Sequence, residues 1–87
     1  MPDQITSLGR ARLTNKQPGH YKEYIITFSQ EFGRYVVRLA WGRIGNGKQT
    51  KTKSFFSRSA AEVFVRETLH TRVEHGYCVE GDITLEI

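Results

Sequence analysis

Residues that build metal sites and disulfides are scarce in this sequence. It contains one cysteine, Cys78, and three histidines among 87 residues. A single cysteine cannot form an internal disulfide, and these histidines lack the paired spacing of structural zinc ligands. The sequence therefore predicts no metal site and no cofactor.

Long apolar runs and targeting features are missing as well. No stretch approaches the roughly 18 apolar residues that a membrane-spanning helix requires. Residues 1–4 have neither the basic nor the apolar region of a secretory signal. We expect a cytoplasmic protein with no membrane partner.

The sequence also lacks a convincing catalytic grouping. Gly42 to Lys48 has the spacing of a phosphate-binding loop, but Gln49 replaces the Ser or Thr that binds magnesium. His75 and Cys78 are close enough to suggest a base and a nucleophile, yet no acid is placed to orient them. We expect no catalytic residues, no small-molecule substrate and no enzymatic activity.

What remains is the composition of a small globular domain. Hydrophobic residues make up 38% of the chain and charged residues 25%, which is typical of chains that fold. A chain of this length builds one core. We expect one domain over residues 8–80, a flexible N-terminus at 1–7, and an edge strand or tail at 81–87.

Most of the chain has the pattern of β-strands. Runs rich in β-branched and aromatic residues are separated by turns that contain glycine. Asn46-Gly47 is the sharpest hairpin signal. The predicted strands are 10–14, 20–29, 33–44 and 48–56.

A helix follows the strands. Ser59-Ala60-Ala61-Glu62 has the form of a capping box, and the predicted helix continues to about His75, where Gly76 ends it. Its apolar stripe consists of Ala61, Phe64, Val65, Leu69 and Val73. The prediction is an α+β fold: a twisted antiparallel sheet of about four to five strands with one helix on one face.

The hairpin signal also predicts the two faces of the sheet. With a two-residue turn at Asn46-Gly47, alternation puts Val37, Leu39 and Trp41 on the apolar face. Arg38 then shares the opposite, basic face with Lys51 and Lys53.

Positive charge is concentrated in one part of the chain. Residues 10–53 contain ten Lys or Arg and two acids, whereas residues 54–87 contain three Arg and six acids. This asymmetry indicates an anionic partner.

One aromatic side chain lies among these cations. Lys and Arg neutralise phosphates, and the indole of Trp41 could stack on a base or sugar. Alternatively Trp41 belongs to the core, in register with Val37 and Leu39, and the lysines only solubilise their strand. Spacing leaves both readings open, and a half-buried Trp41 would satisfy each in part.

Trp41-Gly42-Arg43-Ile44-Gly45 resembles the signature of the WGR domain family. The resemblance extends over roughly residues 10–78, from the strand at 20–28 to the closing Gly76-Tyr77. The chain looks like the short bacterial members of the family, and it is similar to the WGR domain of poly(ADP-ribose) polymerases. In the polymerases this domain helps to bind broken DNA. The signature Trp packs on the sugar at a DNA end, and the signature Arg contacts nucleic acid or neighbouring domains.

The resemblance implies two functional hypotheses. In the first, the domain binds DNA at ends or nicks, Trp41 packs on a terminal nucleotide and Arg43 makes a directed contact. In the second, Trp41 and Arg43 anchor the domain to a separate effector protein, because Trp and Arg are common interface hot spots. The candidate nucleic-acid-binding residues are Arg38, Trp41, Gly42, Arg43, Lys48, Lys51 and Lys53.

Overall fold

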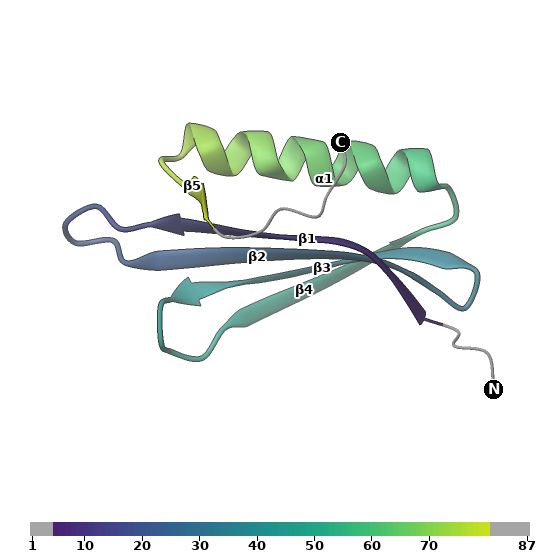
Figure 1. Ribbon diagram of the computed structural model, residues 1–87, viewed down its shortest axis with the longest axis horizontal. Coiled ribbons are helices and arrows are strands. Elements are labelled where there is room, and N and C mark those ends of the chain that lie inside the picture. Colours follow the sequence, from purple (N-terminus) through teal and green to yellow (C-terminus); the bar gives the residue numbers. More distant parts are fainter. Residues whose placement is uncertain (1–4, 81–87) are drawn as a thin grey trace.

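The fold is a single antiparallel sheet with one helix across it. The computed structural model describes residues 5–80. The elements are β1 (Ile5–Asn15), β2 (Lys22–Glu31), β3 (Arg34–Arg43), β4 (Gln49–Phe55), α1 (Arg58–Glu74) and β5 (Cys78–Glu80). The strand order is β4-β3-β2-β1-β5, and every neighbouring pair is antiparallel. Figure 1 shows α1 lying along one face of the sheet, which confirms the predicted α+β fold.

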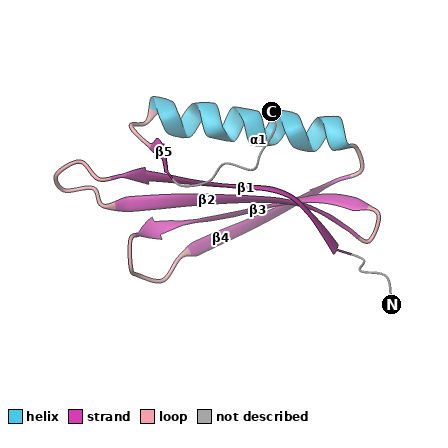
Figure 2. Ribbon diagram, viewed as in Figure 1, coloured by secondary structure: helices cyan, strands magenta, loops and turns pink. Residues whose placement is uncertain are grey.

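The core lies between these two layers (Figure 2). Alternate residues of the central strands point to the helix and are buried, because successive side chains of a strand point to opposite faces. From α1 only Ala61 and Val65 are fully buried. The sheet residues of the core are Ala11, Leu13, Tyr24, Ile26, Phe28, Val37 and Leu39.

The helix begins two residues earlier than the predicted capping box. Ser57 is the N-cap, and its hydroxyl accepts a hydrogen bond from the backbone N–H of Ala60 at 3.4 Å. Ser59 lies inside the helix, so the capping box is wrong. Glu62 instead pairs with Arg58 one turn earlier, at 3.6 Å.

The predicted apolar stripe is wrong at its C-terminal end. Val73 is 51% exposed, whereas Ala61 is fully buried. A repeat of four residues drifts around a helix that has 3.6 residues per turn, by about 120° over these twelve residues. Arg72, at the next position back, faces the sheet instead.

The first strand is longer than predicted. β1 pairs with β2 from Ile5↔Glu31 to Asn15↔Lys22, with an irregularity between Ser7 and Gly9. It therefore includes residues 5–7, which were expected to form part of a flexible end. At the other end of the chain, β5 lies at the free edge of β1, and the edge strand or tail expected at 81–87 lies outside the described residues.

The hairpin between β3 and β4 is not the predicted one. Its loop runs over residues 44–48, and the strands pair as Leu39↔Lys51 and Val37↔Lys53. A two-residue turn at Asn46-Gly47 would shift this register by three residues. Because an odd shift turns every side chain to the other face, Lys51 and Lys53 lie on the helix side of the sheet. Their predicted placement beside Arg38 is wrong.

No helix within residues 5–80 is long and apolar enough to cross a membrane.

Candidate nucleic-acid interface

Trp41 is half-buried on the helix side of the sheet. It pairs across the ladder with Tyr24, and the two rings stack with their centroids 5.8 Å apart and an angle of 16° between the planes. The stack attaches the indole to the core while part of it stays open to solvent. Trp41 therefore lies at the border of the core, and its stacking on a base or sugar stays a prediction.

Gly42 has a structural reason to be glycine. Its φ is +154°, a conformation that residues with a side chain rarely adopt. A Cβ at this position would lie 3.1 Å from the carbonyl oxygen of Gly47, where the loop returns past β3. The glycine of the signature thus allows the 44–48 loop to fold back against the strand.

The side chain of Lys48 stabilises the same loop through hydrogen bonds to its backbone. Its Nζ donates to the carbonyl oxygens of Arg43 at 2.8 Å and Asn46 at 2.6 Å. The same ammonium lies 3.1 Å from Glu23 Oε1, and the side chain is only 18% exposed. Its charge is therefore engaged within the domain.

The Glu23 carboxylate binds a second cation, which completes this network. Arg12 Nη2 donates to Glu23 Oε2 at 2.7 Å. Hydrogen bonds from Arg12, and then from Lys48, hold the pKa of Glu23 below its ordinary value. One buried acid thus neutralises cations from β1 and from the hairpin loop.

Arg38 lies on the face of the sheet opposite the helix, and its charge is also paired. Its guanidinium makes two contacts with the Glu31 carboxylate, one of them an Nη2–Oε1 hydrogen bond of 2.8 Å. Ser29 donates a further hydrogen bond to Glu31 at 2.6 Å. These donors, Arg38 foremost, lower the pKa of Glu31 to about 2. The outer face is therefore not the open basic surface that the sequence predicted.

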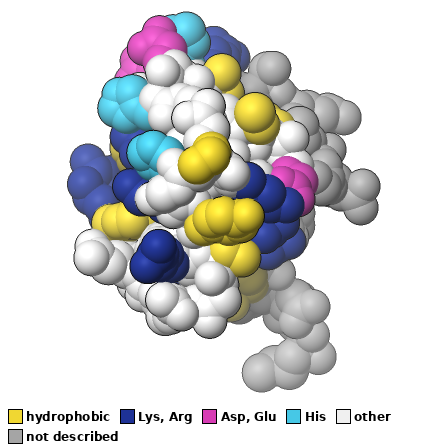
Figure 3. Space-filling model, turned by 90° about the vertical axis from the view of Figure 1, so that its left-hand side faces the viewer, with side chains coloured by type: hydrophobic (Ala, Val, Ile, Leu, Met, Phe, Trp, Pro, Cys, Tyr) yellow, Lys and Arg dark blue, Asp and Glu magenta, His cyan; other side chains and the backbone are white. Residues whose placement is uncertain are grey.

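Four cations on the helix side of β2, β3 and β4 have no ion pair within residues 5–80. Lys22 lies opposite Arg43 at one end of the sheet, in the same ladder as the Tyr24–Trp41 pair. Lys51 and Lys53 follow along β4, also on the helix side. These four, Lys22, Arg43, Lys51 and Lys53, are called the open cations below. Figure 3 looks at the end of the molecule with the hairpin loop and shows Lys and Arg side chains on either side of a small apolar patch.

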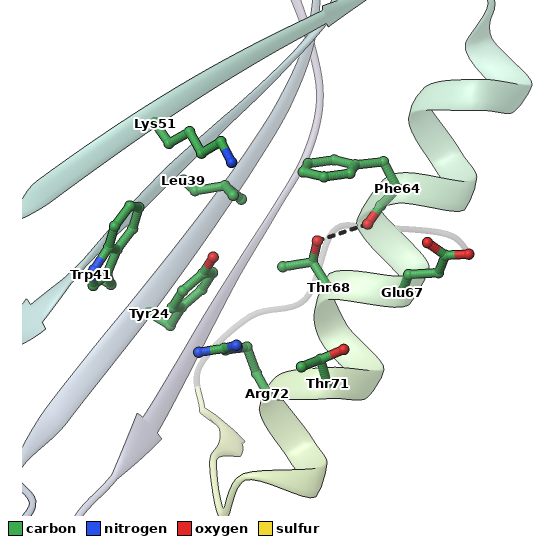
Figure 4. Close-up of a pocket in the computed structure, with 9 residues that line it drawn as sticks. All are labelled: Tyr24, Leu39, Trp41, Lys51, Phe64, Glu67, Thr68, Thr71 and Arg72. Carbon is green, nitrogen blue, oxygen red and sulfur yellow. Dashed lines mark hydrogen bonds between the residues drawn. The ribbon is translucent and has the colours of Figure 1, made fainter.

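A groove separates β4 from the helix beside these cations. It has a volume of about 530 Å³. Figure 4 shows Lys51 and Phe64 at one end of it and Arg72 at the other, with Leu39 and Tyr24 between them. Trp41, Glu67, Thr68 and Thr71 complete its lining.

The comparison with known families agrees with the signature in β3. The model of the WGR domain matches residues 10–83, which is most of the chain. The chain belongs to the WGR domain family. WGR domains are binding modules, of a nucleic-acid-binding type in proteins related to poly(ADP-ribose) polymerases. A search of curated proteins and a search of solved structures each found no match.

In this WGR domain the structure adds one residue, Arg72, that is not among the candidates predicted from the sequence. The guanidinium of Arg72 lies 5.0 Å from the centre of the Tyr24 ring. Its Nε is buried and has no hydrogen-bond partner within the described part of the chain. A heptad count from Val65 would have placed Arg72 on the inner face of the helix.

The WGR residues of the candidate site thus fall into two groups. Gly42, Lys48 and Arg38 shape the hairpin or hold its charges in internal pairs. Trp41, Arg43, Lys51 and Lys53 remain available on the helix side, where Lys22 and Arg72 join them.

Proposed function

We propose that this WGR domain is a non-catalytic module that binds nucleic acid, namely DNA at ends or nicks. The contact surface is the helix side of β3 and β4, with Trp41 and the open cations. The observation that carries the proposal is the charge distribution. The acids at positions 23, 31 and 80 neutralise cations on the outer face, whereas the open cations beside Trp41 have no such partner.

The open cations suit a phosphate backbone. A strand rises about 3.4 Å per residue, so Lys51 and Lys53 are roughly 7 Å apart along β4. Successive phosphates of one DNA strand are separated by about 3.4 Å along the helix axis. The two lysines can therefore follow one strand over about two phosphates, while Arg43 makes a directed contact at the end of β3.

Trp41 provides the selectivity for ends. An indole stacked on Tyr24 cannot reach into an intact base-pair stack, but its open part can pack on a sugar or base at a terminus. A blunt end or a nick presents such a surface, whereas the interior of a duplex does not. Arg38 and Lys48 lie outside this contact, because internal pairs hold their charges.

The test is fluorescence anisotropy of labelled DNA over a series of salt concentrations. Blunt duplex, nicked duplex and circular duplex without ends, the last as an unlabelled competitor, distinguish end binding from general affinity. We expect micromolar or tighter binding that weakens with salt, and weak competition by the circle. Absence of binding even at low salt would refute the proposal.

A protein partner is the second candidate, and exposed aromatic side chains favour it. Phe32 is 70% exposed and Phe56 is 82% exposed, and both lie at the end of the sheet away from Trp41. Affinity capture that recovers a stable partner after nuclease treatment would support a protein contact. If nuclease removes every partner, this candidate fails.

A further inference from the structure

The groove between β4 and α1 is large enough to hold a small ligand. Its volume of about 530 Å³ falls within the roughly 300–1,000 Å³ typical of small-molecule sites. Leu39, Tyr24 and Phe64 give it an apolar floor, and Lys51 and Arg72 place a cation at each end (Figure 4). A ligand that fills it must combine a flat apolar group with negative charge.

Arg72 is the observation that points to an anionic group. Its buried Nε has no hydrogen-bond partner within residues 5–80, and its guanidinium makes no ion pair there. A buried N–H group is costly unless an acceptor reaches it, so the Arg72 Nε–H would gain from a ligand oxygen in the groove. Tyr24 offsets part of this cost through the cation–π contact, but a ring provides no lone pair in the plane of the N–H groups.

The remaining lining argues against a bare phosphate or sulfate as the occupant. Glu67 lies at the helix-side edge of the groove and repels a simple anion. Thr68 donates its hydroxyl hydrogen to the Phe64 carbonyl at 2.8 Å, so its oxygen is left as an acceptor. The Thr68 oxygen is an acceptor that matches an N–H group of a nucleobase.

We infer that the groove receives one unpaired nucleotide at the end of a DNA strand. The base lies over Leu39, beside Tyr24 and Phe64, and the adjacent phosphates lie toward Lys51 and Arg72. This inference rests on the proposed function, since the open cations first bring a DNA end to the helix side of the sheet. The groove then distinguishes a duplex that ends in an unpaired nucleotide from a duplex with a blunt end.

The experiment compares labelled duplexes that differ only at one end. One is blunt, one carries a single unpaired nucleotide, and one carries a single abasic residue that keeps the phosphate but has no base. Both the 3′ and the 5′ versions are measured by anisotropy at one salt concentration. We expect the unpaired nucleotide to tighten binding about tenfold over the blunt end, as one stacked base does. The abasic residue, which keeps the phosphate for Lys51 and Arg72, should give a clearly smaller gain.

A variant that fills the groove, compared with a variant that adds the same side chain elsewhere, tests whether the groove itself binds the nucleotide. Thr68→Phe places a ring in the groove without changing any charge, and Val63→Phe adds the same ring to an exposed position of the helix. We expect T68F to remove the overhang gain but to keep the blunt-end affinity and its salt dependence, and V63F to change neither. If T68F does not fold, Arg72→Gln serves instead and should remove most of the gain.

The possible results separate this inference from the proposed function. Equal, salt-dependent binding of all duplexes overturns the nucleotide groove and leaves the DNA-binding proposal standing. An equal gain from the abasic residue also overturns it, because the base then contributes nothing. Tighter binding of free AMP than of the overhang would assign the groove to a free nucleotide instead. No binding of any DNA refutes both.

Discussion

Removal of two open cations should change the salt dependence of DNA binding by a calculable amount. The perturbation is Lys51→Gln with Lys53→Gln, which removes two positive charges that no carboxylate pairs within residues 5–80. Each neutralised phosphate contributes about 0.9 to the slope of log affinity against log salt. Four open cations therefore give a slope of about −3.6, and the double variant should give about −1.8.

The difference is large enough to measure with modest concentrations of salt. Between 50 and 200 mM salt, the parent domain should lose about 150-fold in affinity and the double variant only about 12-fold. Anisotropy of one labelled blunt duplex over this range provides both slopes. Circular dichroism should show the same fold, because both lysine side chains are exposed on an edge strand.

The matched control removes the same net charge elsewhere. Arg58→Gln with Arg66→Gln changes two exposed residues of α1 that do not line the groove. This control should keep a slope near −3.6. If both double variants reduce the slope equally, net charge rather than the β4 surface controls binding, and Lys51 and Lys53 do not form the phosphate contact.

Three further predictions test the framework around the site. Gly42→Ala should lower the free energy of unfolding in urea by about 1–3 kcal/mol through backbone strain and contact with the loop, whereas Gly47→Ala, with open space around its Cα, should change it by less than about 0.5 kcal/mol. Ser57→Ala should cost about 1 kcal/mol as a lost cap, and a comparable loss for Ser59→Ala would contradict the observed cap. The hydrogen bonds of Glu31 lower its pKa from 4.5 to about 2. The ionised carboxylate should therefore stabilise the fold fully above pH 4.5, and this contribution should disappear as the pH falls toward 2. Melting temperatures over that range should fall less steeply for Glu31→Gln than for the parent.

Local patterns in the sequence were sufficient for the elements and the class of fold. Strands 20–29 and 33–44, the helix and the two-layer arrangement all follow from periodicity and turn residues, and the structure confirms them. The signature at Trp41 was sufficient for the family, since the family model covers the same region. These features depend on neighbouring residues, which is why the sequence reveals them.

The face on which a strand residue lies depends on pairing between strands, and here the sequence misled. Asn46-Gly47 favours a two-residue turn locally, but the structure has a longer loop in which Lys48 binds Glu23 and the loop carbonyls. The resulting shift of three residues moves Lys51 and Lys53 from the outer face to the helix side. The ion pair with Glu31 on the neighbouring strand likewise neutralises the charge of Arg38, which the sequence presents as free.

The strands, the helix, the WGR family and the excess of positive charge are thus all evident in the amino-acid sequence. Which of those charges remain open depends on the folded chain, because an ion pair such as Arg38–Glu31 or Lys48–Glu23 depends on strand register rather than on composition. The fold also places Trp41 and Arg72 beside one groove, since this requires α1 to pack across the sheet at a particular rotation. Local propensity acts over a few residues, whereas a binding surface is assembled from side chains that meet only when the chain folds.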